Sequence, residues 1–79
     1  MERLTIYDIK RLTAETEPYF FSRKTLKFFG QTLKDFSVYK IDSEHYKIKA
    51  VMKDRLSNNR FMGYTERIFN LKTKKLEKV

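Results

Sequence analysis

The residues of this chain best suited to chemistry are basic, and three of them lie close together. Arg23 and Lys24 follow Ser22, a residue type that commonly begins a helix, and Lys27 comes one helical turn after Arg23. The first turn of a helix favours acidic side chains, and like charges four residues apart repel. A bound phosphate would offset both effects, because helix N-termini also offer free N–H groups to anions. The three residues therefore indicate an anion-binding site or, alternatively, a solvated basic face.

A second group of basic residues lies in a segment where lysines alternate with apolar residues. Lys47, Lys49 and Lys53 fall on one side of a predicted strand. Lys40 and Arg67 could join them from neighbouring strands, depending on the register. Such a stripe could follow a phosphate backbone. It could equally be the solvent-facing side of a sheet, where lysines discourage pairing at exposed edges.

A polar loop is predicted at residues 55–60, and its arginines and asparagines could contact base edges or a protein partner, or simply connect two strands. Tyr39 and Tyr46 could stack on bases if they are exposed. The candidate residues for binding nucleic acid or another anion are Arg23, Lys24, Lys27, Lys47, Lys49 and Arg60.

The composition favours binding over catalysis. The chain carries 18 Lys and Arg against 10 Asp and Glu, and this net charge of +8 favours a polyanionic partner, usually nucleic acid, although it could also serve solubility. His45 is the single histidine, there is no cysteine, and no GxSxG motif or glycine-rich phosphate loop occurs. Asp42 and Glu44 lie in a predicted turn, where solvated carboxylates are expected. We therefore expect no enzyme activity, no cofactor and no metal site.

Signs of membrane insertion or export are missing from the sequence. No apolar run approaches the roughly 20 residues of a membrane-spanning helix. Met1, Glu2 and Arg3 lead into an amphipathic pattern and not into the apolar core of a signal peptide. We expect a soluble protein of the host-cell cytoplasm, folded as a single domain over residues 1–79.

Two helices are predicted in the N-terminal half. Thr5 and Asp8 have the spacing of a capping box, so the first helix is expected over residues 6–15, and Pro18 stops it. Ser22 begins the second helix, expected over residues 23–29, and Gly30 ends it.

Strands are predicted after Lys34, where the apolar residues begin to alternate. They are expected at residues 36–39, 46–53 and 61–70, with a short edge strand at 75–78. Short connections make a meander the simplest order. The fold class is therefore α+β, with two short N-terminal helices packed on one face of a three- to four-stranded antiparallel sheet.

Residues 18–30 read PYFFSRKTLKFFG. This segment resembles the signature F-F-x-R-x-T-M-x-F-F of a family of small, uncharacterised proteins encoded by phages, prophages and plasmids, with Leu26 where Met is common. The resemblance covers about the first half of the chain, and it implies a mobile-element origin without naming an activity. Small phage proteins often bind nucleic acid, or bind and block a host defence or transcription protein, so both functions are expectations by analogy.

The same segment can be explained by packing alone. Apolar residues at helical spacing could anchor the second helix to the sheet: Phe21, Leu26, Phe28 and Phe29. Alternatively, Phe20 or Phe28 could form a platform for a base and a phosphate together with Arg23 and Lys27.

The leading hypothesis is a non-catalytic accessory protein of a phage or mobile element that binds DNA or RNA through its basic surface. The alternative is an inhibitor of a host defence system, of the anti-CRISPR or anti-restriction type, that docks on an acidic patch or an aromatic pocket of a protein. Either could be a monomer or a homodimer, the latter paired through residues 61–70 or the C-terminal edge.

Overall fold

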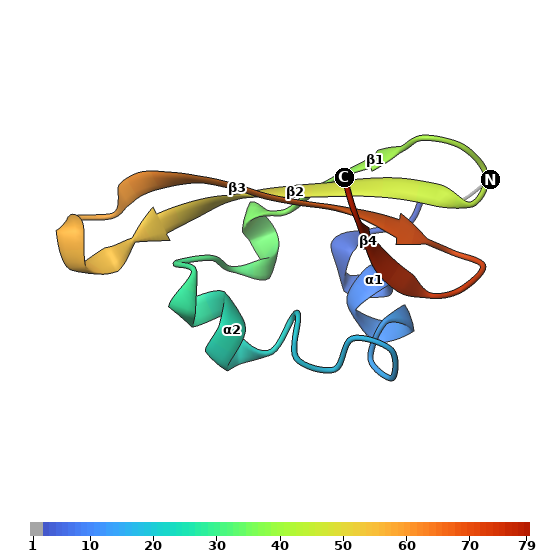
Figure 1. Ribbon diagram of the computed structural model, residues 1–79, viewed down its shortest axis with the longest axis horizontal. Coiled ribbons are helices and arrows are strands. Elements are labelled where there is room, and N and C mark those ends of the chain that lie inside the picture. Colours follow the sequence, from blue (N-terminus) through green and yellow to red (C-terminus); the bar gives the residue numbers. More distant parts are fainter. Residues whose placement is uncertain (1–2) are drawn as a thin grey trace.

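The computed structural model describes residues 3–79, and these form two short helices followed by a four-stranded antiparallel sheet (Figure 1). The strands lie in the order β1-β2-β3-β4, so the α+β class and the meander are confirmed. The elements are α1 (Ile6–Leu12), α2 (Arg23–Phe28), the 3₁₀-helix η1 (Leu33–Asp35), β1 (Ser37–Lys40), β2 (His45–Asp54), the 3₁₀-helix η2 (Arg55–Ser57), β3 (Arg60–Asn70) and β4 (Lys75–Lys78).

No helix within the described residues is long and apolar enough to span a lipid bilayer. The expectation about a signal peptide rests partly on Met1 and Glu2, which lie outside the described residues.

Helix α1 begins with the predicted capping box. The backbone N–H of Asp8 donates to the Thr5 hydroxyl at 3.2 Å, and the Thr5 N–H donates to the Asp8 carboxylate at 2.9 Å. The helix ends at Leu12, three residues earlier than expected. Thr13 is fully buried at this end, and its hydroxyl donates to the carbonyl oxygen of Ile9 at 2.8 Å. Side-chain bonds of this kind compete with the backbone ladder of a helix, which accounts for the early stop.

Helix α2 begins at Arg23 as predicted, and the Ser22 hydroxyl accepts the Thr25 N–H at 3.2 Å. Beyond the helix, Gly30 has a φ of +65°, a conformation that favours glycine. The backbone approaches β2 closely here: the Lys53 N–H donates to the Phe29 carbonyl at 3.0 Å, and a Cβ on Gly30 would collide with the Lys53 carbonyl oxygen. This contact fixes the end of α2 against β2.

The register of the sheet divides its residues between two faces. One of them, the core face, carries Tyr46, Ile48 and Ala50 of β2 and Phe69 of β3. These residues form a single hydrophobic cluster with buried residues from the N-terminal half: Ile6, Ile9, Phe21, Leu26 and Phe36. In Figure 1 both helices and η1 lie on the same side of the sheet. The other face, the outer face, carries Tyr39, Lys47, Lys49 and Tyr64 among others.

Of the four apolar residues expected to anchor α2 to the sheet, two are buried and two are exposed. Phe21 and Leu26 are buried, but Phe28 is 79% exposed and Phe29 is also exposed. In a helix with 3.6 residues per turn, Phe28 points about 200° away from Leu26. Because α2 is only six residues long, it buries a narrow stripe and leaves both phenylalanines outside it.

Beyond the four-stranded part, β2 and β3 continue as a two-stranded ribbon. β1 pairs with residues 46–49 of β2, and β4 pairs with residues 67–70 of β3. The remaining residues, 50–66, are called the distal ribbon here; they include η2 at the tip and appear at the left of Figure 1. The register shifts between Met52 and Lys53, an irregularity that increases the local twist of a strand pair.

Replacing Gly30 with alanine tests the contact between α2 and β2. Gly30→Ala should lower the free energy of unfolding in urea by more than about 1 kcal/mol, because the new methyl group meets backbone and the φ is positive. Gly63→Ala is the comparison for backbone strain without a collision: its φ of +120° is also unfavourable for alanine, but the nearest atom to the new Cβ is the flexible Met52 methyl at 3.7 Å. An unchanged free energy of unfolding in Gly30→Ala would contradict the proposed role of the contact.

Candidate nucleic-acid interface

An open groove of about 600 Å³ lies between α1, α2, η1 and the tip of the distal ribbon. We call it the basic groove because five of its lining residues are cationic: Lys10, Arg23, Lys27, Lys34 and Arg55. Among the described residues, no carboxylate lines it. The arrangement gathers positive charge from four separate elements at one surface.

The groove combines an apolar floor with charged sides. Phe21 and Leu26 are buried beneath it, and Gln31 is held by a hydrogen bond from its side-chain amide to the Thr65 hydroxyl at 2.8 Å. Arg23 and Lys27 lie four residues apart and therefore on the same side of α2. The contacts that bury Leu26 thus also determine where these two cations stand.

No ion pair among the described residues neutralises the charge in the groove. Within residues 3–79 the ion pairs join Arg11 to Asp8, His45 to Asp42 and Lys47 to Glu66, and none involves a cation of the groove. The nearest carboxylate in sequence, Asp35, accepts the backbone N–H of Thr32 at 2.8 Å. Clustered cations without counter-charges create a positive potential that attracts polyanions.

The candidate residues predicted from the sequence do not form one site. Arg23 and Lys27 line the basic groove, whereas Lys24 is exposed on α2 and does not line it. Lys47 and Lys49 lie on the outer face. Arg60 is exposed at the start of β3, near the ribbon tip.

The two lysines of the outer face already have partners. Lys47 Nζ lies 3.0 Å from Glu66 Oε2, a contact that lowers the pKa of this carboxyl group. Lys49 Nζ lies 4.2 Å from the centroid of the Tyr64 ring, in a cation–π contact. These contacts reduce the capacity of both lysines to hold phosphate.

The register also narrows the expected lysine stripe. Lys40 pairs with Tyr46 and Arg67 with Ile48, so neither lies on the outer face with Lys47. Lys40 and Arg67 therefore do not belong to the lysine stripe, which the sequence had left open. Arg67 instead lies over the Phe20 ring, with its guanidinium carbon 5.6 Å from the centroid.

The tyrosines differ from one another in accessibility. Tyr46 is only 3% exposed, so its expected role in stacking is ruled out, while Tyr39 is about half exposed on the outer face. Tyr64 is equally exposed and was not predicted; it lines the same shallow hollow as Tyr39 and Lys49. The Phe61 ring meets Tyr64 edge-to-face at 5.2 Å between centroids. The outer face therefore presents aromatic surface more than free charge.

A helix N-terminus contributes little to anion binding here. Helix α2 has six residues, which is less than two turns, and the Ser22 hydroxyl already accepts the Thr25 N–H. The positive field of the groove therefore arises mainly from side chains. Sequence reasoning did not place Lys10, Lys34 or Arg55 beside Arg23, because only the packing of α1, η1 and η2 brings them there.

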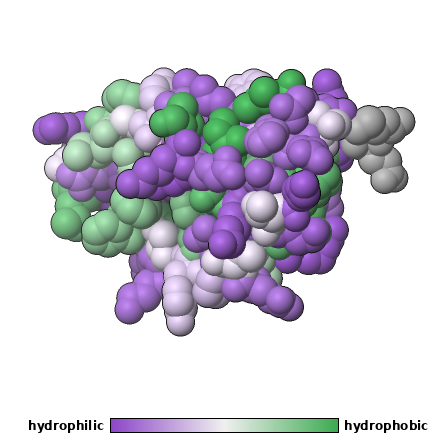
Figure 2. Space-filling view, turned by 45° about the vertical axis from the view of Figure 1, so that its right-hand side comes forward, coloured by the Kyte–Doolittle hydropathy of each residue, from purple (hydrophilic) through white to green (hydrophobic). Residues whose placement is uncertain are grey.

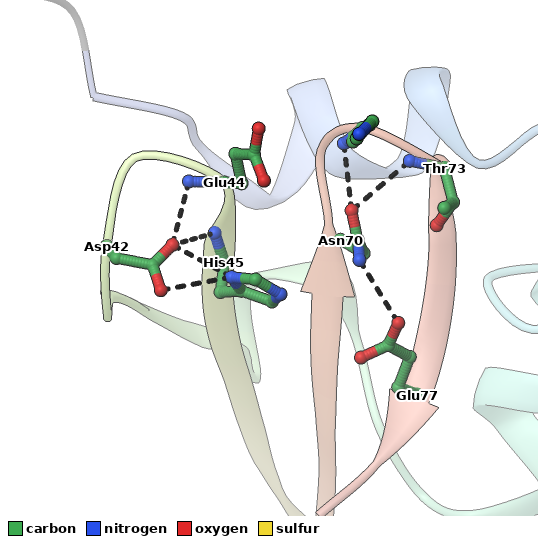
Figure 3. Close-up of polar contacts among 7 residues, drawn as sticks. Asp42, Glu44, His45, Asn70, Thr73 and Glu77 are labelled. Carbon is green, nitrogen blue, oxygen red and sulfur yellow. Dashed lines mark hydrogen bonds and ion pairs between the residues drawn. The ribbon is translucent and has the colours of Figure 1, made fainter.

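The turn between β1 and β2 contains an exposed acid–histidine pair (Figure 3). Asp42 Oδ1 accepts the backbone N–H groups of Glu44 and His45 at 2.8 and 2.9 Å, and it lies 2.8 Å from His45 Nδ1. The hydrogen bond to Asp42 raises the pKa of His45. The backbone N–H of Glu44 and the His45 ring lower the pKa of Asp42. These bonds shape the turn, and no group of three metal-binding side chains occurs among residues 3–79.

The contact between Asp42 and His45 should make the stability of the protein depend on pH. The histidine should titrate above 6.5 by NMR, and Asp42→Asn should return its pKa toward that value while keeping an acceptor for the backbone N–H groups. Stability from His45 is complete below 6.5 and is lost as the pH rises through its higher folded pKa. Stability from Asp42 is present above 3.8 and is lost as the pH falls through its lower folded pKa.

Both charges are present when the pH lies between the ordinary pKa values of 3.8 for Asp42 and 6.5 for His45. The difference in unfolding free energy between the wild type and Asp42→Asn should therefore be larger in this pH range than at alkaline pH. An unchanged His45 titration in the variant would contradict the pairing.

No protein-family model matches this chain, and searches of curated proteins and of solved structures found no significant match.

Proposed function

We propose that this protein is a non-catalytic module that binds nucleic acid in its basic groove. The observation that carries the proposal is the lining of the groove, where five cations from four elements meet without a carboxylate among the described residues. Lysines and arginines that contact phosphates release condensed counterions, and this release drives binding of any sequence.

An aromatic residue beside the cations supports nucleic acid over a small anion. Tyr7 lines the groove beside these cations and is half exposed. Exposed rings beside a basic groove can stack on bases while the cations hold the backbone. The proposed roles are therefore phosphate contact for the groove cations and base stacking for Tyr7.

The proposal includes the helix packing, the origin and the cellular location expected from the sequence. The two helices pack on one face of the sheet and form the walls of the groove, within one domain. The chain serves a phage or another mobile element in the host cytoplasm, in keeping with the segment at residues 18–30.

Binding can be measured by fluorescence anisotropy with labelled single- and double-stranded DNA and RNA, in salt between about 50 and 200 mM. Affinity should fall steeply with salt. The double charge reversal Arg23→Glu/Lys27→Glu should weaken binding at least about tenfold, and it should reduce the slope of log K against log salt by roughly 1.4 to 1.8.

The matched control is Lys72→Glu/Lys75→Glu, which changes the net charge equally at exposed residues outside the groove. This control should keep the slope of the wild type. Absence of binding at low salt, or equal losses in the two variants, would overturn the proposal.

A second candidate function is inhibition of a host defence protein, and the outer face favours it. Tyr39, Phe61 and Tyr64 are exposed there, and aromatic residues are enriched at protein interfaces. Under this candidate, one host protein should be retained stoichiometrically from nuclease-treated lysate. Tyr39→Ser/Tyr64→Ser should abolish its retention, and Arg23→Glu/Lys27→Glu should not. Retention that depends on Arg23 and Lys27 instead would count against the outer face.

A further inference from the structure

The tip of the distal ribbon holds a leucine almost entirely in water. Leu56 is 99% exposed, although it is one of the larger aliphatic side chains of the protein. Its position is defined by the backbone: the Leu56 N–H donates to Asp54 Oδ1 at 3.0 Å, and Asn58 and Asn59 close the turn with φ values of 57° and 59°. A short polar turn thus displays an apolar side chain at the end of the molecule.

Two arginines and two asparagines flank this leucine, beside the Asp54 carboxylate that accepts its backbone N–H. Arg55 and Arg60 are exposed on either side of it, and Asn58 and Asn59 are exposed between them. In Figure 2 the left end, which carries the ribbon tip, shows green apolar atoms directly beside purple hydrophilic ones. Arg55 also lines the basic groove, so this one residue belongs to both the tip and the groove.

The residue types of the tip fit a groove of duplex DNA. The distal ribbon is two strands wide and ends in η2, so the molecule narrows to a single turn there. Proteins that read the minor groove use Arg, Lys and Asn for its edges and phosphates, and they commonly insert Leu, Ile, Met or Phe between stacked bases. Residues 55–60 bring together Arg, Asn and Leu from this set.

We propose that Leu56 is a wedge that enters the minor groove of duplex DNA and partly unstacks one base step. Asn58 and Asn59 face the base edges, while Arg55 and Arg60 contact the flanking phosphates. The proposal rests on the nucleic-acid function inferred above and specifies its substrate as a duplex that bends. A protein partner with a pocket for Leu56 is a poorer candidate than DNA. Leucine is under-represented among the residues that dominate protein interfaces, and cations flank Leu56.

The wedge can be tested on duplex DNA that carries 2-aminopurine and a donor–acceptor pair at its ends. Wild-type protein should raise the 2-aminopurine fluorescence and bring the ends closer together. Leu56→Ser should lose both signals and weaken duplex binding by roughly tenfold, with the single-strand affinity and the salt slope unchanged. Leu56→Met, which keeps an apolar wedge, should retain both signals. Because Leu56 is exposed, both variants should unfold at the same urea concentration as the wild type.

The outcomes separate this inference from the proposed function. If Leu56→Ser bends and unstacks the duplex like the wild type while the groove variant loses binding, the wedge is overturned and the groove stands. If the wild type binds no nucleic acid at low salt, both are overturned. If Leu56→Ser leaves DNA binding intact and loses a host protein from nuclease-treated lysate, a protein anchor replaces the wedge.

Discussion

The arrangement of this molecule depends on the close approach of the end of α2 to β2. The Phe29 carbonyl accepts the Lys53 N–H, and Gly30 lets the two backbones come together where any side chain would collide. This contact places the six residues of α2 beside the distal ribbon, and with them Arg23 and Lys27 beside Arg55. The groove therefore depends on a backbone contact more than on the basic residues themselves, which are exposed. A helix so short has little stability of its own, so its position must come from tertiary contacts.

Basic residues have two different uses in this chain. On the outer face Lys47 is paired with Glu66 and Lys49 lies over Tyr64, so their charge stabilises contacts within the sheet. In the basic groove no carboxylate among the described residues plays this part. Net charge alone would not distinguish these uses, because both sets contribute equally to the total of +8.

Local signals in the sequence predicted the elements well, and tertiary relations were predicted less well. Thr5, Ser22 and Gly30 act within a few residues of themselves, so the starts of both helices and the stop after α2 could be read directly. Which residues of the sheet face the core depends on the register of the strands. Ile68 and Phe69 are both apolar and adjacent in sequence, yet only Phe69 is fully buried. The groove required knowledge of how α1, η1 and η2 pack together, which no pattern along the chain contains. Arg23 and Lys27 were found because they share one helix, and their partners from other elements were not.

The sequential pairing of the strands has a consequence for how the basic groove forms during folding. Each strand pairs with its neighbour in the chain, and the longest pairing, between β2 and β3, spans a single hairpin. Contacts between nearby residues form quickly, because little chain entropy is lost in closing them. The basic groove instead joins α1 near the N-terminus to η2 beyond the middle of the chain. A folding chain should thus complete its sheet before its positive surface, so an incompletely folded molecule would offer polyanions only scattered charges.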